Sequence, residues 1–128
     1  MSITFRVDHE RRRILACGEG RLTYEEVCDY GVAVRPFRMV GYDELFDAAA
    51  VVATLTPDQI RTLATRAQQE ATATALWGMI AIVAKEPVVF GLSRMYATLA
   101  ESAGLKVAVF YDLAEAEEWL GSRRAPGG

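Results

Sequence analysis

The segments WGMIAIVA (residues 77–84) and KVAVFY (residues 106–111) decide the fold class of this chain. Both are nearly continuous apolar runs, and a segment with helical periodicity, about residues 88–103, separates them. Strands that are buried on both faces of a parallel sheet have this composition. We therefore predict two adjacent parallel strands that are joined by a helix.

The start of the chain predicts an antiparallel hairpin. Ile3, Phe5 and Val7 alternate with polar residues, which is the period of a half-buried strand, and a charged turn leads into a second strand at residues 12–18. A third strand, about residues 41–47, places Leu45 on one face and Tyr42 and Phe46 on the other. This strand is expected to end at Asp47.

Capping boxes mark three helix starts. In such a box, a short polar side chain and an acidic or amide side chain three residues later each accept from a free amide at the other position. Pro36 is expected to end the first helix, because proline disfavours helical geometry at the preceding residue. The second helix is expected to reach about residue 75, and Gly104 and Gly121 to end the third and fourth. The three boxes are residues 23–26, 56–59 and 112–115.

These elements predict a single α/β domain over residues 1–121. Its five-stranded sheet is mostly parallel with an antiparallel N-terminal strand, and right-handed crossovers are expected to leave helices on both faces. Residues 122–128, which contain Pro126 and two glycines, predict a disordered tail. The side chains expected to be almost fully buried are Ile80, Ile82, Leu99, Val107 and Val109.

The composition argues against several classes of protein. A net charge of −3 and a pI near 5.2 do not favour nucleic acid or anionic lipid as a partner. The chain shows no signal peptide and no apolar run of the ~20 residues that span a bilayer, so we expect a cytoplasmic protein without an integral membrane segment. Cys17, Cys28 and His9 lack metal-ligand spacing, so neither a disulfide, a metal nor a cofactor is expected.

Several stretches together resemble the bacterial SpoIIAA-like proteins of the STAS superfamily, which are related in fold to lipid-transfer domains of the CRAL-TRIO type. The resemblance covers nearly the whole chain. It implies a compact α/β domain that is used mainly for binding and regulation. The stretches that carry it are the opening hairpin, GRLTYEE (residues 20–26), the strand with Asp47, FGLSRMY (residues 90–96) and AEEWL (residues 116–120).

This chain departs from the regulatory STAS pattern at one position. Those proteins carry a phosphorylatable serine or threonine just after the aspartate that ends this strand, whereas Asp47 is followed by three alanines. A phosphate could still reach Thr54 or Thr56, but Thr56 has a structural explanation as a helix cap. The usual phosphorylation switch is therefore not expected.

Open α/β sheets usually bind ligands at the carboxyl ends of their strands, which selects the loops at residues 47–56, 85–91 and 111–112. Lys85 and Arg94 could hold an anion near a helix start, while Phe90 and Tyr96 supply apolar walls. Three of these also have a structural interpretation: Lys85 in a solvated turn, Tyr96 in the core, and Arg94 lying over its own helix. The ligand-site candidates are Asp47, Lys85, Phe90, Arg94, Tyr96 and Asp112.

Three classes of function fit this sequence. The first is a noncatalytic regulatory or protein-interaction module, and the second is a binder of a small apolar, amphipathic or anionic ligand. The third is an enzyme that uses Asp47, Lys85 and Asp112 as an acid–base set. A closed apolar pocket would favour the second class and a flat apolar surface patch the first. The apolar content and the edge strand also predict a homodimer.

The box at residues 56–59 makes a testable prediction about stability. Thr56→Ala should lower the free energy of unfolding by about 1 kcal/mol, because a helix amide loses its acceptor. Thr56→Asp should be tolerated, because a carboxylate also caps and interacts favourably with the helix dipole. Urea unfolding of both variants measures this difference, and equal losses of stability would contradict the capping role.

Overall fold

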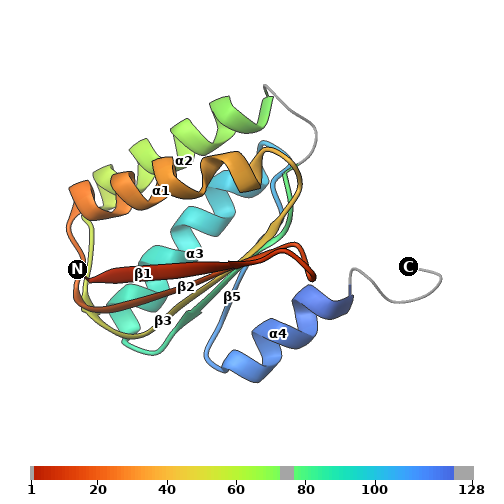
Figure 1. The fold of residues 1–128 in the computed structure, drawn as a ribbon. Coiled ribbons are helices and arrows are strands. Elements are labelled where there is room, and N and C mark those ends of the chain that lie inside the picture. The colour runs from red at the N-terminus through yellow and green to blue at the C-terminus, as the bar shows by residue number, and fades with distance from the viewer. Residues whose placement is uncertain (1, 73–76, 123–128) are drawn as a thin grey trace.

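The computed structural model describes residues 2–72 and 77–122, which form a mixed sheet with helices on both faces (Figure 1). The fold class is the one that the sequence predicts. The elements in chain order are β1 (Ile3–Asp8), β2 (Arg13–Arg21), α1 (Tyr24–Arg38), β3 (Asp43–Ala53), α2 (Pro57–Thr72), β4 (Ile80–Ala84), α3 (Pro87–Glu101), β5 (Val107–Phe110) and α4 (Leu113–Ser122).

The strands lie in the sheet in the order in which they occur in the chain, β1-β2-β3-β4-β5. β1 pairs antiparallel with β2, and the other neighbours are parallel. Successive right-handed crossovers that always step in one direction place their helices on one face. Accordingly α1, α2 and α3 cover one face of the sheet, and α4 alone packs on the other (Figure 1). Helices do lie on both faces, but the second face is covered by α4, which follows the last strand, and not by a crossover helix as the sequence predicted.

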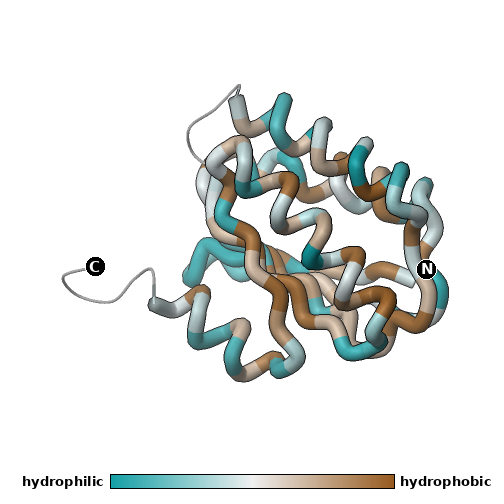
Figure 2. Tube along the Cα trace, turned by 180° about the vertical axis from the view of Figure 1, so that it is seen from behind, coloured by the Kyte–Doolittle hydropathy of each residue, from teal (hydrophilic) through white to brown (hydrophobic). Residues whose placement is uncertain are grey.

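The side chains alternate between these two faces along each strand. Ile14, Val51 and Ile80 point toward the three-helix layer, and Leu45, Ala81 and Val83 point toward α4, where Leu120 is fully buried. Apolar segments lie in the middle of the molecule and hydrophilic ones toward the outer turns of the helices (Figure 2). The sheet is therefore the centre of two cores, which explains the apolar composition of β4 and β5.

The predicted helix starts are confirmed where the structure shows reciprocal capping. Thr23 Oγ1 accepts from the Glu26 amide at 3.2 Å while Glu26 Oε1 accepts from the Thr23 amide at 3.3 Å. The same exchange joins Thr56 and Gln59, at 3.2 and 3.0 Å. Gly104 follows α3 with a φ of 87°, as expected of a glycine after a helix. Gly121, in contrast, does not end the fourth helix, because it lies within α4, which runs to Ser122.

The prediction that β3 ends at Asp47 is wrong, because the strand continues to Ala53. A bulge hides this continuation: between the pairs Cys17↔Asp47 and Glu19↔Ala50, β3 contains one residue more than β2. Asp47 Oδ1 accepts from the Ala49 amide at 3.0 Å within the bulge. The bulge interrupts the alternation of faces, so a pattern of period two stops there although the strand does not.

The prediction that Pro36 ends α1 is also wrong, because the helix includes Pro36 and runs to Arg38. Proline removes one backbone donor, but this loss falls in the last turn, where the Met39 amide still donates to the Arg35 carbonyl at 3.0 Å. Tertiary contacts hold this turn, since the Phe37 ring packs against Tyr42 and Arg38 binds Glu44. The extra turn therefore comes from packing that the local sequence does not reveal.

The other differences concern boundaries and burial. β4 begins at Ile80 rather than at Trp77, and Ile80 and Val107 are buried, whereas Ile82, Leu99 and Val109 are only half-buried. The predicted end of the second helix near residue 75 and the predicted tail from residue 123 onward lie outside the described residues.

Gly78 provides a test of the packing before β4. A Cβ at Gly78 would overlap the Tyr42 carbonyl and lie 2.7 Å from Asp43 Oδ1, an atom that accepts from the Met79 amide. Gly78→Ala should therefore destabilise the fold by about 1–3 kcal/mol.

Gly91 is the matched control, because a Cβ there meets nothing within 4 Å in α3. Gly91→Ala should raise stability by about 0.5–1 kcal/mol, since alanine suits a helix interior better than glycine. Urea unfolding of both variants is the measurement. An unchanged free energy of unfolding in Gly78→Ala would contradict the close approach of Gly78 to the Tyr42 carbonyl.

Candidate functional site

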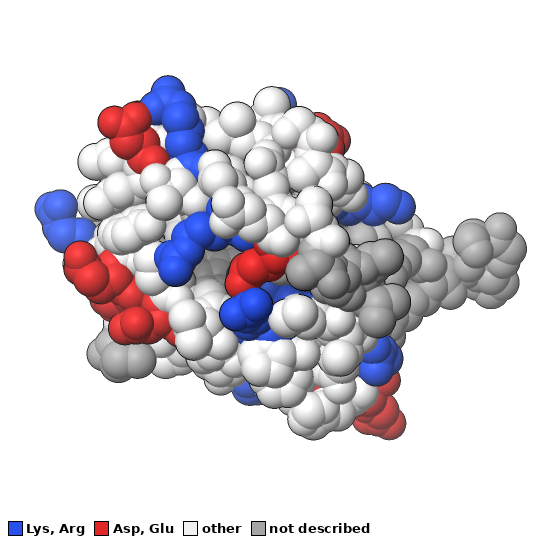
Figure 3. Space-filling view, turned by 90° about the horizontal axis from the view of Figure 1, so that it is seen from above, with Lys and Arg blue, Asp and Glu red and all other residues white. Residues whose placement is uncertain are grey.

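A partly enclosed cavity of about 250 Å³ lies between the sheet and the three-helix layer. α1 forms one wall, α2 and α3 form the other, and β3 and β4 form the floor. Basic and acidic side chains lie beside a hollow on the face that α1 and α2 present (Figure 3). The cavity therefore lies above the middle of the sheet and not only at the carboxyl ends of its strands.

The cavity exists because its walls carry small residues where larger side chains could fill the space. Gly31 on α1, Ala48 on β3, Ala67 on α2 and Ser93 on α3 all line it. On the α4 side, by contrast, larger side chains such as Met79, Phe110 and Trp119 pack together. Ile82 is half-buried because it faces this cavity and not a filled core.

Most of the cavity wall is apolar. Side chains from α2, α3 and the carboxyl half of β3 supply this surface, which suits a hydrocarbon or an aromatic ring. The apolar lining residues at this end are Val51, Leu55, Ile60, Leu63, Val89 and Leu92.

The other end of the cavity holds a buried polar network centred on Glu44. Arg38 donates from Nε to Glu44 Oε1 at 2.6 Å and from Nη2 to Oε2 at 2.8 Å, and the Tyr30 hydroxyl donates to Oε2 at 2.6 Å. The Arg38 and Glu44 side chains are 14% and 3% exposed. A buried carboxylate needs this degree of hydrogen bonding to remain charged.

The surroundings of Arg38 and Tyr30 raise the pKa of both groups. Burial, the largest single effect, lowers the pKa of Arg38, but the attraction and hydrogen bonds to Glu44, together with Tyr96 and Tyr30, outweigh burial and raise that pKa. Burial and the neighbouring Glu44 charge raise the pKa of Tyr30, so its hydroxyl keeps the proton that it donates. Arg38 therefore keeps its charge, and Tyr30 its proton, over the ordinary pH range.

Two donors at this end are left for a ligand. Arg38 Nη1 has no hydrogen-bond partner among the described residues, and it lies on the cavity side, 3.9 Å from the position of a Cβ on Gly31. Tyr96 is half-buried in the cavity wall, and its hydroxyl also lacks a partner within the described part of the chain. Burial raises the pKa of Tyr96, so this hydroxyl remains a donor.

Two polar contacts join α1 to α2 at the cavity. Arg35 Nε lies 3.0 Å from Glu70 Oε2, and Arg66 Nη1 donates to Cys28 Sγ at 3.3 Å. Three arginines and two glutamates line the cavity, because Arg38 and Glu44 add to Arg35, Arg66 and Glu70. The formal charge of the lining is thus one positive unit, which favours an anionic over a cationic ligand.

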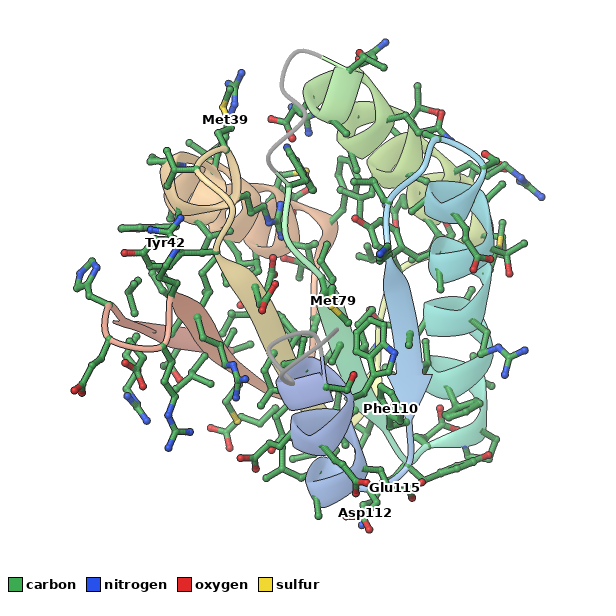
Figure 4. The ribbon with its side chains drawn as sticks, turned by 90° about the vertical axis from the view of Figure 1, so that its right-hand side faces the viewer. Met39, Tyr42, Met79, Phe110, Asp112 and Glu115 are labelled. Carbon is green, nitrogen blue, oxygen red and sulfur yellow. The ribbon has the colours of Figure 1, made fainter. Side chains whose placement is uncertain are left out.

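The structure separates the six residues that the sequence selects as ligand-site candidates. Only Tyr96 lines the cavity. Phe90 stacks on Tyr111 at the carboxyl edge of the sheet, with ring centroids 4.1 Å apart and an interplanar angle of 8°. At the same edge, Asp112 lies at the start of α4, where its Oδ1 accepts from the Ala114 amide at 3.0 Å (Figure 4).

The remaining candidates lie elsewhere. Lys85 and Arg94 are exposed on the surface, and Asp47 lies on the α4 side of the sheet. The acid–base set of Asp47, Lys85 and Asp112 has no hydrogen bond or ion pair between its members. Within the described residues, no group of three His, Cys, Asp or Glu side chains could hold a metal ion.

Sequence reasoning missed Arg38, Glu44 and Tyr30, the residues that form the polar network. A signal was present for Glu44, because the predicted strand places it on the same face as Tyr42 and Phe46. A carboxylate on an inward face needs a buried partner. Arg38 had no such signal, since it follows the proline at which the helix was expected to end.

The polar network makes a prediction about stability. Arg38→Met should cost about 3–5 kcal/mol, because it leaves the Glu44 carboxylate buried without its cation. Arg38→Met combined with Glu44→Gln should recover part of that loss, since the amide is neutral and still accepts from Tyr30. Urea unfolding at neutral pH measures both variants.

An exposed ion pair on the same protein is the control. Arg61 and Asp58 are 58% and 92% exposed, so Arg61→Met should change stability by less than about 1 kcal/mol. The double variant should be more stable than Arg38→Met alone. Equal stability of the two would show that the loss does not come from the unpaired, buried Glu44 carboxylate.

None of the helices within the described ranges is long and apolar enough to cross a membrane. No family model matches the sequence, and no curated protein matches it. In a comparison of structures, the chain is similar to an uncharacterized protein of the DUF3478 family from Shewanella loihica PV-4, described as having a SpoIIAA-like fold. The two chains are 15% identical, the match covers 93% of this chain and 94% of the other, and the TM-score is 0.59. The chain therefore has the SpoIIAA-like fold, the fold that its sequence resemblance to STAS-type modules implies.

Proposed function

We propose that this chain is a noncatalytic binding module that holds a small amphipathic anion in the cavity between its helix layer and its sheet. The observation that carries this proposal is a cavity with an apolar wall at one end and the unused donors of Arg38 and Tyr96 at the other. A tail would lie between α2, α3 and β3, and a carboxylate would face Arg38 Nη1 and the Tyr96 hydroxyl.

The volume limits the size of the ligand. An engineered apolar cavity of about 150 Å³ accommodates benzene. On the same scale, about 250 Å³ suits roughly ten non-hydrogen atoms, the size of octanoate. Each buried methylene contributes about 0.8 kcal/mol, so the tail supplies affinity while the head group fixes orientation.

The cavity is unsuited to a cationic head group. Arg38 cannot release its proton, and it already neutralises Glu44, so a second cation would meet no free negative charge at this end. A carboxylate, in contrast, accepts from a guanidinium through short, charge-assisted hydrogen bonds. We therefore expect octanoate to bind and octylammonium not to bind.

A protein-interaction role is the second candidate, and a different observation favours it. Four apolar side chains with exposed fractions between 40% and 67% lie at or just beyond the carboxyl ends of the strands, namely Val52, Val88, Tyr111 and Leu113. Such a surface suits a protein partner, including one whose binding depends on whether the cavity is filled. The cavity supports the ligand-binding proposal more strongly, because it provides both volume and directed polar groups.

Isothermal titration calorimetry with octanoate tests the proposal through a variant that fills the cavity. Ser93 lines the cavity and donates to the Val89 carbonyl at 2.8 Å, so Ser93→Phe should weaken octanoate binding at least tenfold. Hexanoate should bind the natural chain roughly tenfold more weakly than octanoate, because it buries two methylenes fewer.

Thr98→Phe is the matched control, because Thr98 makes the same kind of bond, to the Arg94 carbonyl at 3.0 Å, on the exposed side of α3. It should bind octanoate like the natural chain. Equal binding by the natural chain and a folded Ser93→Phe variant would exclude the cavity as the site.

A further inference from the structure

We propose that the free edge of β1 is the contact through which two copies of this chain pair, antiparallel and around a two-fold axis at Phe5. β1 is the outer strand of the sheet, and no other element lies in front of it in the view of Figure 1. Its pairing with β2 has no bulge, and it contains no proline. Two common devices that protect an edge strand from pairing are therefore missing.

The hydrogen-bond pattern shows which residues of β1 point outward. The Glu19 amide donates to the Ser2 carbonyl at 3.0 Å, so Ser2 belongs to a hydrogen-bonded pair with β2. In an antiparallel ladder such pairs alternate with pairs whose amides and carbonyls point away. Ile3, Phe5 and Val7 therefore present their amides and carbonyls to the open edge, while Thr4 and Arg6 bond to β2.

The sequence of β1 is self-complementary around Phe5. With Phe5 on the axis, Ile3 lies opposite Val7 of the second copy, so all three outward residues pair through their free backbone groups. Their side chains form an apolar row on the helix side of the sheet. On the α4 side, Thr4 lies opposite Arg6 of the second copy.

The neighbouring two-fold registers fit less well. An axis at Arg6 would place two guanidinium groups directly opposite each other, which is destabilising. An axis at Thr4 would pair Ile3 with Phe5 and leave the outward groups of Val7 beyond the ends of the paired strands.

Burial also points to Phe5. Its side chain is 40% exposed at the edge, although one side of the ring packs edge-on against Tyr30 with centroids 5.7 Å apart. A second Phe5 across the axis would cover this apolar surface. The start of β1 is held in place for such pairing, because the Ser2 amide donates to Glu26 Oε2 at 3.1 Å.

Cysteine cross-linking tests both the contact and its register. In a chain with Cys17→Ser and Cys28→Ser, Phe5→Cys should form a disulfide-linked dimer under mild oxidation, because paired Cα atoms about 5.5 Å apart can be bridged. Val7→Cys is the control on the same face and should not cross-link, because the two residues would lie roughly 13 Å apart. Thr4→Cys and Arg6→Cys should cross-link more slowly than Phe5→Cys.

Multi-angle light scattering of the natural chain supplies an independent measurement. The mass should approach twice 14.1 kDa as the concentration rises. Phe5→Pro removes an outward amide and the ring that would meet its copy across the axis, but no backbone hydrogen bond to β2. It should therefore raise the dissociation constant at least tenfold while the circular dichroism spectrum stays that of the natural chain. A mass of one chain at every concentration would overturn the proposal, as would a dimer in which Thr4→Cys or Arg6→Cys cross-links faster than Phe5→Cys.

Discussion

Right-handed crossovers between neighbouring parallel strands are the constraint on which the rest of this structure depends. From β2 to β5, each parallel strand lies beside the one before it, and the order across the sheet always advances in the same direction. The connecting helices α1, α2 and α3 must therefore share one face. The opposite face is then left to α4, which packs against Leu45, Ala81 and Val83 but cannot cover β1 and β2 as well. The same order leaves β1 at the edge with one side unpaired.

Three helices on one face of a five-stranded sheet do not have to touch each other along their whole length. Here α1 and α2 are linked by Arg35 with Glu70 and by Arg66 with Cys28, and small residues line the space between them. The ion pair of Arg38 and Glu44 fixes the last turn of α1 to the floor of that space. The fold thus explains where the cavity lies, while the side chains explain why it is not filled and why one end is polar.

The sequence was sufficient for the elements that are fixed by local chemistry or by strong periodicity. The capping residues Thr23 and Thr56 and the apolar strands around Ile80 and Val107 are of this kind. It was insufficient where a tertiary contact overrides a local rule: Arg38 lies beyond Pro36, and β3 continues past Asp47 through a bulge. Of the candidate site, only Tyr96 was selected beforehand, because a polar network inside a core consists of residues that are distant in sequence and ordinary in type.

The cavity also has a volumetric consequence. Incomplete packing between the layers of a protein adds to the volume of its folded state. Hydrostatic pressure favours states of smaller total volume, so it acts against such a region first. The small side chains of Gly31, Ala48, Ala67 and Ser93 therefore make the three-helix side the more compressible side of the sheet. Large side chains fill the contact of α4 with the sheet around Met79, Phe110 and Trp119, so under pressure the layer of α1 should loosen before that contact does.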